Sequence, residues 1–323
     1  MRRRPGPALL AELANVPLPD FDPIGPPWPG RTQSIAGASV FVRHTPSTSA
    51  DGQPAVYVHG LAGSSTNWTD LAALLAPWLD GTALDLPGFG RSGPAPGGDY
   101  SIAAAARVVA GHIVQSGRGP VHLVGNSMGG AACIMVAATR PDLVRTLTLI
   151  SPAVPDLRLV RPDADPLMGL LLVPGPASNL VERRLSMLPP RMRVLGTLRL
   201  CFADVDRLPP ERLDQAVEEL TARRGQPWTT TAFTRSLRGL VRHWLAVGPM
   251  SAWRELNKIQ APSLVVWGDR DKLVDVRLAP RVARAIPDCR LLVLNDVGHT
   301  AQMEEPRLTA RAMLGLLRAA DPS

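Results

Sequence analysis

The sequence predicts an α/β protein: a mostly parallel, doubly wound sheet flanked by helices, with a helical cap inserted into it. Two observations lead to this fold class. Over residues 35–152, and again over 255–323, short apolar runs rich in β-branched residues alternate with helical patterns, and such alternation is typical of a parallel sheet with helices on both faces. Over residues 153–254 the alternation lapses and only helical patches remain. We therefore expect the two outer ranges to form one core and the middle range to form the cap.

The first 34 residues precede this pattern. They contain a proline-rich stretch over 16–31 and are expected to form an irregular arm over the body of the protein. The core elements then follow in order. The expected strands cover 39–43, 54–60, 82–86, 121–125, 145–151, a run beginning at Ser263, and 290–294, and the expected helices cover 67–79 and 101–115 in the core and 211–223 and 231–245 in the cap.

One short turn is the most informative feature of the chain. The run Val121–Val124 has the composition of a buried strand and Ala131–Ala138 that of a buried helix, and between them stands G-x-S-x-G with Ser127 at its apex. Gly125 and Gly129 suit a turn so tight that a Cβ would collide with neighbouring backbone. Such a turn exposes its serine hydroxyl at the N-terminus of a helix. Ser127 is therefore the candidate nucleophile.

A serine hydroxyl needs a base to take its proton, and the base needs a third group to orient it. His299 follows the expected strand 290–294, at the sheet edge where open α/β sheets place their sites. His122 and His112 fall inside a strand and a helix, where structural roles are expected, and His243 falls in the cap. His299 is thus the candidate base.

Position alone leaves several candidates for the acid. Asp269, Asp271 and Asp275 share the loop after the strand that begins at Ser263, and Asp156 follows the strand before it. In this fold class the acid lies between the serine and the histidine along the chain. All four aspartates satisfy that condition.

The last part of a serine site is a pair of backbone N–H groups that meet the developing oxyanion. Residues 55–65 have the pattern of a strand that ends in a Gly-rich loop. One donor is expected from Leu61 in this loop and the other from Met128, the residue after the nucleophile. His59, Gly60 and Asn126 flank these donors and are expected to contact the substrate.

Several motifs together resemble the α/β-hydrolase superfamily. They are H-G-L-A-G at 59–63, Trp68, D-L-P-G-F-G-R-S at 85–92, G-N-S-M-G-G at 125–130, W-G-D-R-D at 267–271 and G-H-T-A-Q-M-E at 298–304. The resemblance is to serine-triad members of esterase or lipase type. It implies that Asp271, three residues after a glycine, is the acid, and that Asp85 is structural.

Within that superfamily, G-N-S-M-G-G and the last motif also resemble the meta-cleavage-product C–C bond hydrolases. Two positions depart from that subfamily. Its oxyanion loop is usually rich in Gly and Pro, whereas this chain has H-G-L-A-G-S-S, and its histidine is usually followed by Trp, whereas this chain has Thr300. A serine at the elbow separates the chain from epoxide hydrolases and haloalkane dehalogenases, which use aspartate there.

Composition narrows the remaining classes. Cys133, Cys201 and Cys289 are too few and too scattered for a disulfide framework or a metal site, so we expect a reducing compartment, no metal and no cofactor. The longest apolar run, Leu167–Val173, is far shorter than the ~20 residues of a membrane span. Together with Met187 and Leu188 it is expected to line an acyl pocket, with packing inside the cap as the alternative. We expect a soluble, cytoplasmic protein.

The formal net charge is +7, carried by 33 arginines and two lysines, a bias that points to a GC-rich bacterial genome. Residues 153–254 hold 15 arginines against 10 acidic residues. No nucleic-acid-binding motif accompanies this charge, so no nucleic-acid partner is expected. An anionic membrane surface, touched peripherally, or an acidic substrate fits better.

These observations together predict a serine hydrolase that cleaves carboxylic esters of a largely apolar, acyl or lipid-like acid through an acyl-serine. One alternative is C–C bond hydrolysis of meta-cleavage-product type by the same triad. Another is a binding protein that kept the scaffold without catalysis.

Overall fold

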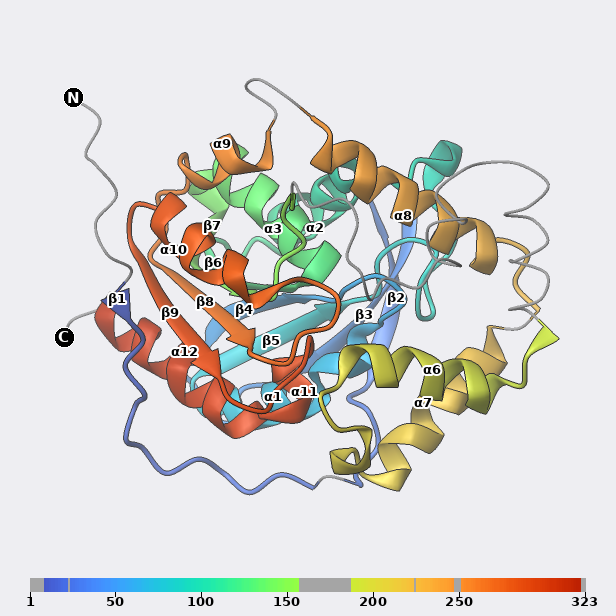
Figure 1. The fold of residues 1–323 in the computed structure, drawn as a ribbon, viewed down its shortest axis with the longest axis horizontal. Helices are drawn as coiled ribbons and strands as arrows, with labels where there is room; N and C mark the ends of the chain where they lie inside the picture. Colours follow the sequence, from blue (N-terminus) through green and yellow to red (C-terminus); the bar gives the residue numbers. More distant parts are fainter. Residues whose placement is uncertain (1–8, 23, 157–186, 224, 247–250, 321–323) are drawn as a thin grey trace.

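The computed structural model describes residues 9–22, 24–156, 187–223, 225–246 and 251–320. Its centre is a nine-stranded sheet in the order β1-β9-β8-β7-β6-β4-β5-β3-β2 (Figure 1). β3 pairs antiparallel with both β2 and β5, and the other six pairings are parallel, so the predicted fold class is confirmed. The strands are β1 Leu9–Leu10, β2 Gly30–Ile35, β3 Ala38–Thr45, β4 Gln53–Val58, β5 Leu79–Leu84, β6 Val121–Asn126, β7 Val144–Ile150, β8 Ser263–Gly268 and β9 Cys289–Leu294.

Helices cover both faces of this sheet. Strand side chains alternate between the faces: in β8, Val265 and Trp267 join one apolar cluster and Leu264 and Val266 join the other. Helices α2, α3, α9 and α10 pack on the first cluster, and α1, α11 and α12 on the second. Their bounds are α1 Thr69–Leu75, α2 Ile102–Ser116, α3 Ser127–Thr139, α9 Ala252–Leu256, α10 Ala279–Ala285, α11 Ala301–Glu304 and α12 Pro306–Ala320.

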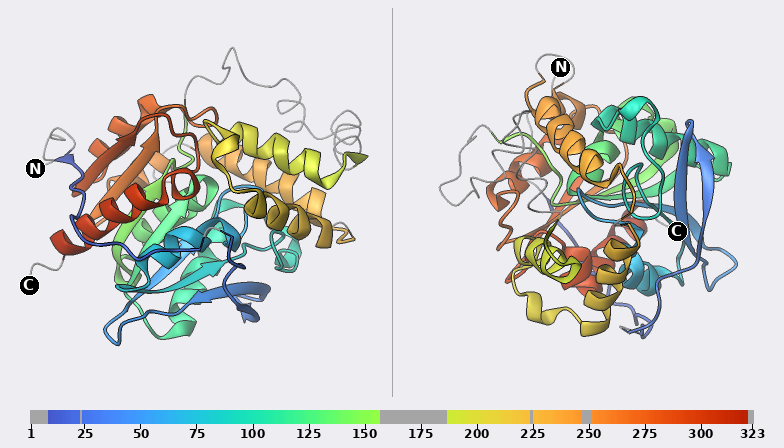
Figure 2. Two further views of the ribbon diagram at one scale, coloured as in Figure 1. Left: turned by 90° about the horizontal axis from the view of Figure 1, so that it is seen from below. Right: turned by 90° about the vertical axis from the view of Figure 1, so that its right-hand side faces the viewer.

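The cap lies between β7 and β8 in sequence and gathers beside the sheet, on the side away from β1 (Figures 1 and 2). Its described helices are α6 Pro190–Cys201, α7 Pro210–Ala222 and α8 Thr229–Trp244. Helices α7 and α8 match the two expected cap helices, whereas α6 has no counterpart among them. Helix α9 begins inside the expected cap range but packs on α3 and α10, because Ala252 and Leu256 are buried there. The core therefore resumes at Ala252.

Residues 1–34 were expected as an irregular arm, and two parts of that range are strands instead. Residues 30–34 pair antiparallel with β3, and Leu9–Leu10 pair in parallel with Arg290 and Leu291 of β9. These two segments form the two edges of the sheet, where a strand supplies partners for otherwise unpaired backbone groups. Short exposed runs such as these carry little apolar periodicity, which is why the sequence pattern does not reveal them.

Candidate active site

The expected strand–turn–helix elbow is formed by β6 and α3. Ser127 has φ +52°, a left-handed conformation that is costly for a residue with a side chain. The turn around it is tightly packed: a Cβ on Gly129 would lie 2.3 Å from the carbonyl oxygen of Val58, and one on Gly125 would lie 2.6 Å from Sγ of Cys133. The elbow therefore keeps its serine strained at the apex, half-buried among buried neighbours.

His299 and Asp271 form a buried pair at the neighbouring strand ends. Nδ1 of His299 lies 2.8 Å from Oδ2 of Asp271, and both side chains are buried. Oδ1 of the same aspartate accepts the N–H groups of Leu273 and Val274 at 2.8 and 2.9 Å. Burial alone would raise the pKa of Asp271, but His299 and these two N–H groups outweigh it and lower the pKa below its ordinary value. The carboxylate is thus held ionised and oriented toward the ring.

The other candidate acids are engaged elsewhere or face solvent. Asp275 accepts the N–H of Arg277 at 3.0 Å and also pairs with that residue's guanidinium. The side chain of Asp269 is exposed. Asp156 is half-buried beyond β7, whereas Asp271 is the aspartate that contacts the imidazole of His299.

Asn126 joins the serine elbow to the histidine loop. Its side-chain amide donates to the carbonyl oxygen of His299 at 3.0 Å and to that of Ile150 at 3.1 Å. The residue is buried. Asn126 was expected to contact substrate, yet these contacts use its amide inside the protein. They bring the residue before Ser127 into direct contact with the backbone of His299.

The Gly-rich loop after β4 passes over the elbow. A Cβ on Gly60 would lie 3.0 Å from Cβ of Ser127, so this glycine permits the close approach. Leu61 follows it and is half-buried. Met128 is the second residue of α3, in the first turn, where backbone N–H groups have no partner within the helix. The two expected oxyanion donors thus lie in the two segments that meet at Ser127.

His59 is fully buried beneath the same loop. Leu86 donates its N–H to Nε2 at 2.9 Å, so the proton lies on Nδ1, which donates to the carbonyl oxygen of Gly60 at 2.7 Å. Burial lowers the pKa of His59, which fits this neutral form. Both ring nitrogens therefore bind protein backbone, and the ring supports the loop rather than facing a ligand.

Asp85 fixes the neighbouring turn, as the resemblance implied. Its carboxylate accepts the N–H of Ser65 at 2.6 Å and that of Arg91 at 2.7 Å. Ser65 belongs to the loop over the elbow, so a buried anion ties the two turns together.

Three charged residues near the site escaped the sequence analysis. Glu219 of α7 accepts hydrogen bonds from the hydroxyls of Ser64 and Thr66 at 2.9 and 3.2 Å. Lys272 and Glu304 contact the end of α6, as described below. Glu304 lies in the motif at 298–304 and Lys272 directly follows the motif at 267–271, so the motifs could have pointed to both residues. Glu219 lies on a cap helix far away in sequence, where no motif points to it.

No group of three or more His, Cys, Asp or Glu side chains within the described ranges has an arrangement suited to a metal ion. Burial raises the pKa of the Cys133 thiol beneath the elbow. That thiol is therefore a packing group, and Ser127 is the nucleophile candidate that faces outward.

Comparison with known proteins gives a consistent result. The profile of the family described as alpha/beta hydrolase fold matches residues 54–306. A monoacylglycerol lipase of Xenopus laevis, abhd6-B, is 27% identical over 263 residues, which cover 80% of this chain and 74% of the relative. A 2-hydroxy-6-oxononadienedioate/2-hydroxy-6-oxononatrienedioate hydrolase of Cupriavidus pinatubonensis is 25% identical over 285 residues, which cover 87% of this chain and 92% of the relative.

Comparison with solved structures also finds similar hydrolases. A membrane phospholipase A, described as a bacterial virulence factor, aligns with a TM-score of 0.69 at 25% identity. The alignment covers 90% of this chain and 86% of the phospholipase chain.

Proposed function

We propose that this chain, a hydrolase that belongs to the α/β-hydrolase fold family, cleaves carboxylic esters of a largely apolar acid through an acyl-serine intermediate. The observation that carries the proposal is the buried pair of His299 and Asp271, 2.8 Å apart, at the strand ends beside the strained Ser127 elbow. A buried acid that orients an imidazole is the arrangement that activates a serine.

In the proposed reaction, each candidate residue has a defined role. Nε2 of His299 takes the proton of the Ser127 hydroxyl as its oxygen attacks the ester carbonyl carbon. Asp271 holds the Nδ1–H and stabilises the imidazolium that forms. The N–H groups of Leu61 and Met128 donate to the oxyanion. His299 then returns the proton to the leaving alcohol, and a water activated by the same ring hydrolyses the acyl-serine.

A mostly apolar cavity, whose lining also includes Asp99 and Arg107, supports the preference for an apolar acid. It has a volume of about 80 Å³, lies where α8 of the cap meets the core, and reaches Met128. Its apolar lining includes Leu86, Phe89, Val108 and Met128. The run Leu167–Val173, which was also expected to line an acyl pocket, lies outside the described residues. Of the cap's other expected pocket residues, Met187 is 78% exposed and Leu188 is also exposed.

The test is a panel of p-nitrophenyl esters of graded chain length, assayed beside a dienoate C–C substrate. Ester hydrolysis that rises with chain length supports the proposal. Cleavage of the dienoate alone supports the second candidate, C–C hydrolysis, which the 25% identical Cupriavidus relative favours. Failure of Ser127 to react with a fluorophosphonate probe, with no turnover of either substrate, supports a binding protein instead.

The acid is tested by two neighbouring substitutions. Asp271→Asn removes the carboxylate that fixes the histidine tautomer, and we expect kcat to fall about 10⁴-fold. Asp269→Asn is the matched control because its side chain is exposed two residues away, and we expect less than a twofold change. A larger loss in Asp269→Asn than in Asp271→Asn overturns the assignment.

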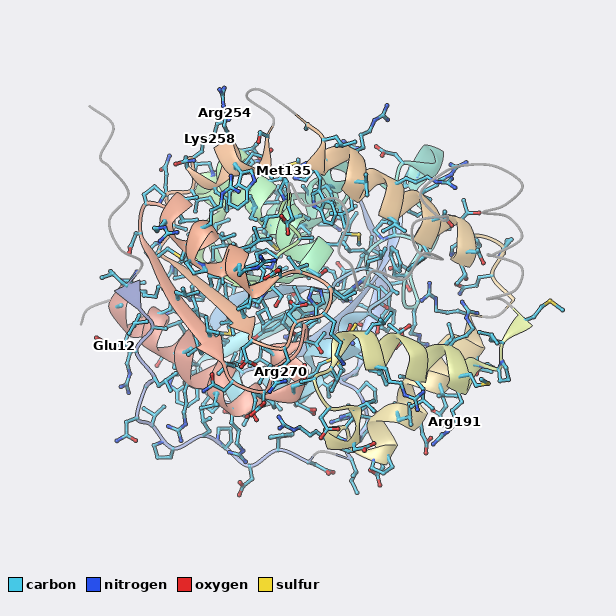
Figure 3. The ribbon with its side chains drawn as sticks, viewed as in Figure 1. Glu12, Met135, Arg191, Arg254, Lys258 and Arg270 are labelled. Atoms are coloured by element: carbon cyan, nitrogen blue, oxygen red, sulfur yellow. The ribbon has the colours of Figure 1, made fainter. Side chains whose placement is uncertain are left out.

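We also propose that the cap meets anionic lipid. Helix α6 carries Arg191, Arg193 and Arg199 and no acidic residue, and Met192 and Leu200 are exposed beside them. Arg191 extends outward from the cap, where it pairs with Asp214 (Figure 3). Among the described residues, no helix is long and apolar enough to cross a membrane.

Vesicle sedimentation tests this contact. Each cation near an anionic surface contributes about 1 kcal/mol. Binding to anionic but not zwitterionic vesicles, weakened by salt and by the double change Arg191→Gln and Arg199→Gln, supports it. Equal, negligible binding to both vesicle types contradicts it and leaves a protein that acts on dissolved esters.

A further inference from the structure

The C-terminal end of cap helix α6 is fastened to both loops that carry the acid and the base. We name residues 199–203 the cap clamp. Lys272, the residue after Asp271, donates from Nζ to the carbonyl oxygens of Arg199 and Phe202, each at 2.9 Å. His299 donates its own backbone N–H to the carbonyl oxygen of Cys201 at 2.6 Å. One short piece of the cap therefore touches the acid loop and the histidine loop together.

Glu304 closes this arrangement. One carboxylate oxygen accepts the N–H of Ala203 at 2.8 Å, and the other accepts the N–H of Gly298 at 2.9 Å. Its side chain thus bridges the cap clamp to the residue that precedes His299. Glu304 is buried, and burial raises its pKa, against which the two N–H groups act. Burial of a carboxylate costs free energy unless the group is hydrogen-bonded. Glu304 therefore depends on both of these N–H donors.

The backbones themselves are in close contact at this point. A Cβ on Gly298 would lie 2.4 Å from the carbonyl oxygen of Cys201 and 2.6 Å from the nitrogen of Ala203. Phe202 is buried, which anchors the clamp from its apolar side. The histidine loop is consequently bounded on one side by the cap, and on the other by the Asn126 amide that donates to the His299 carbonyl oxygen.

We infer that the cap clamp sets the position of His299 relative to Asp271, and that Glu304 and Lys272 are positioning residues for the catalytic pair. The inference rests on the proposed function. Loops move more than the elements they connect, and a misplacement of about 1 Å at a catalytic group costs on the order of 10²-fold in rate. The cap is then part of the catalytic apparatus as well as a cover over it.

The first test is Glu304→Gln. The amide keeps one acceptor but turns an NH₂ group toward a backbone N–H, so one side of the bridge is lost. We expect kcat for a short p-nitrophenyl ester to fall about 10–100-fold with KM within twofold, and the downfield proton NMR signal of the His299 Nδ1–H to weaken or shift. Glu305→Gln is the control, because that side chain is partly exposed and its nearest cation, Arg207, is 4.0 Å away. It should change kcat by less than twofold.

The second test is Lys272→Met, which is safe for folding because the side chain lies at the surface. It should lower kcat in the same way. Since both residues act through one segment, the double variant should lose less than the product of the two single losses.

Wild-type activity and fluorophosphonate labelling of Ser127 distinguish a failure of the clamp inference from a failure of the proposed function. If the wild type hydrolyses esters and is labelled, but Glu304→Gln and Lys272→Met both keep kcat within twofold, the clamp inference is wrong and the proposed function stands. If the wild type is neither active nor labelled, the proposed function fails first. Independent, fully multiplicative losses also overturn the shared action of the two residues.

Discussion

The core and the cap helices α6 and α7 are held mainly by different forces. In the core, every residue of β8 is buried, and apolar clusters fill both faces of the sheet. In the cap, α6 buries none of its residues and α7 buries one, the charged Arg212, whereas α8 buries Ala232 and Leu240, the latter in the core cluster. Apolar burial is non-directional and grows with area, whereas hydrogen bonds to charged groups fix an orientation. Apolar burial thus holds the core together and attaches α8 to it, whereas α6 and α7 are oriented mainly by a small number of polar contacts.

Those contacts remove charged side chains of the cap from water, which has an energetic cost. Burial and the nearby Asp85 raise the pKa of Glu219, and burial lowers the pKa of Arg223. Arg223 nevertheless donates to the carbonyl oxygen of Gly88 at 2.7 Å, in the turn next to the elbow. We therefore expect that replacing a single charged residue can shift the cap without unfolding the core.

The largest expected effect lies in the core and concerns rate alone. Ser127→Ala should lower ester hydrolysis by about a millionfold, because removal of a triad nucleophile disables the whole unit. The unfolding free energy should stay level or rise, since the strained residue loses only a hydroxyl. Kinetics and urea unfolding of the same preparation measure both. Activity within tenfold of wild type would contradict the role of Ser127.

The next effect contrasts apolar burial in the two regions. Trp267→Ala in β8 removes a fully buried side chain and should lower the unfolding free energy by about 3–5 kcal/mol. Met192→Ala in α6 removes an exposed one and should change it by about 0.5 kcal/mol or less. Urea denaturation measures the difference. Similar losses at the two positions would show that the cap is held by apolar burial as the core is.

A smaller effect is expected at the cap's main charged anchor. Arg212 donates to the carbonyl oxygen of Gly25 at 2.6 Å and pairs with Asp70. Arg212→Ala removes the cation that pairs with Asp70 and one of the two donors to Gly25, whose carbonyl oxygen keeps Gln215 at 3.1 Å, and should cost about 1–3 kcal/mol. Limited proteolysis should then cleave the cap sooner than the core. Arg235→Ala is the control, since this exposed residue makes one 3.3 Å bond to Gly98; equal sensitivity of the two variants would rule out an anchoring role.

The smallest effect is a difference in pH dependence between a core acid and a cap acid. The pKa of Asp271 is lowered in the folded state, so its stabilisation is present above the unfolded value of ~3.9 and is lost as pH falls through the folded pKa. The pKa of Glu219 is raised, so its contribution is present below ~4.3 and is lost as pH rises through the folded pKa.

Two variants test these opposite slopes. The stability advantage of wild type over Asp271→Asn should shrink as pH falls below about 4. The stability of wild type relative to Glu219→Gln should instead decline as pH rises above about 4, by about 1.4 kcal/mol for each unit of pKa difference. Urea midpoints across pH 3.5–8 measure both. Slopes of the same sign would refute the contrast.

The local sequence was enough to predict the elements whose conformation depends on neighbouring residues. The Ser127 elbow follows from a β-branched run, two glycines and an apolar helix start, and the structure has that strand–turn–helix with a left-handed serine. Choosing Asp271 over Asp269 needed the resemblance to a family, because two aspartates in one loop differ in orientation rather than in pattern. The hydrogen bond to His299 depends on where β8 and β9 end in space.

Long-range contacts were beyond the sequence pattern. Helix α6 was not predicted because it has no buried face and so no apolar periodicity to detect. His59 and Asn126 looked like ligand-facing polar residues from their motifs, yet their partners are backbone atoms of Leu86 and His299, 27 and 173 positions away. Only folding brings such pairs together.

The N-terminal arm contacts three parts of the molecule in turn. It pairs with the outer edge of β9, passes α12 where Ala14 donates to the carbonyl oxygen of Arg311, and reaches the cap where Arg212 binds Gly25. Proteolytic cleavage near residue 20 would therefore affect two regions away from the cleaved bond. It would free a sheet edge for association between molecules, and it would loosen the cap without touching a single catalytic side chain.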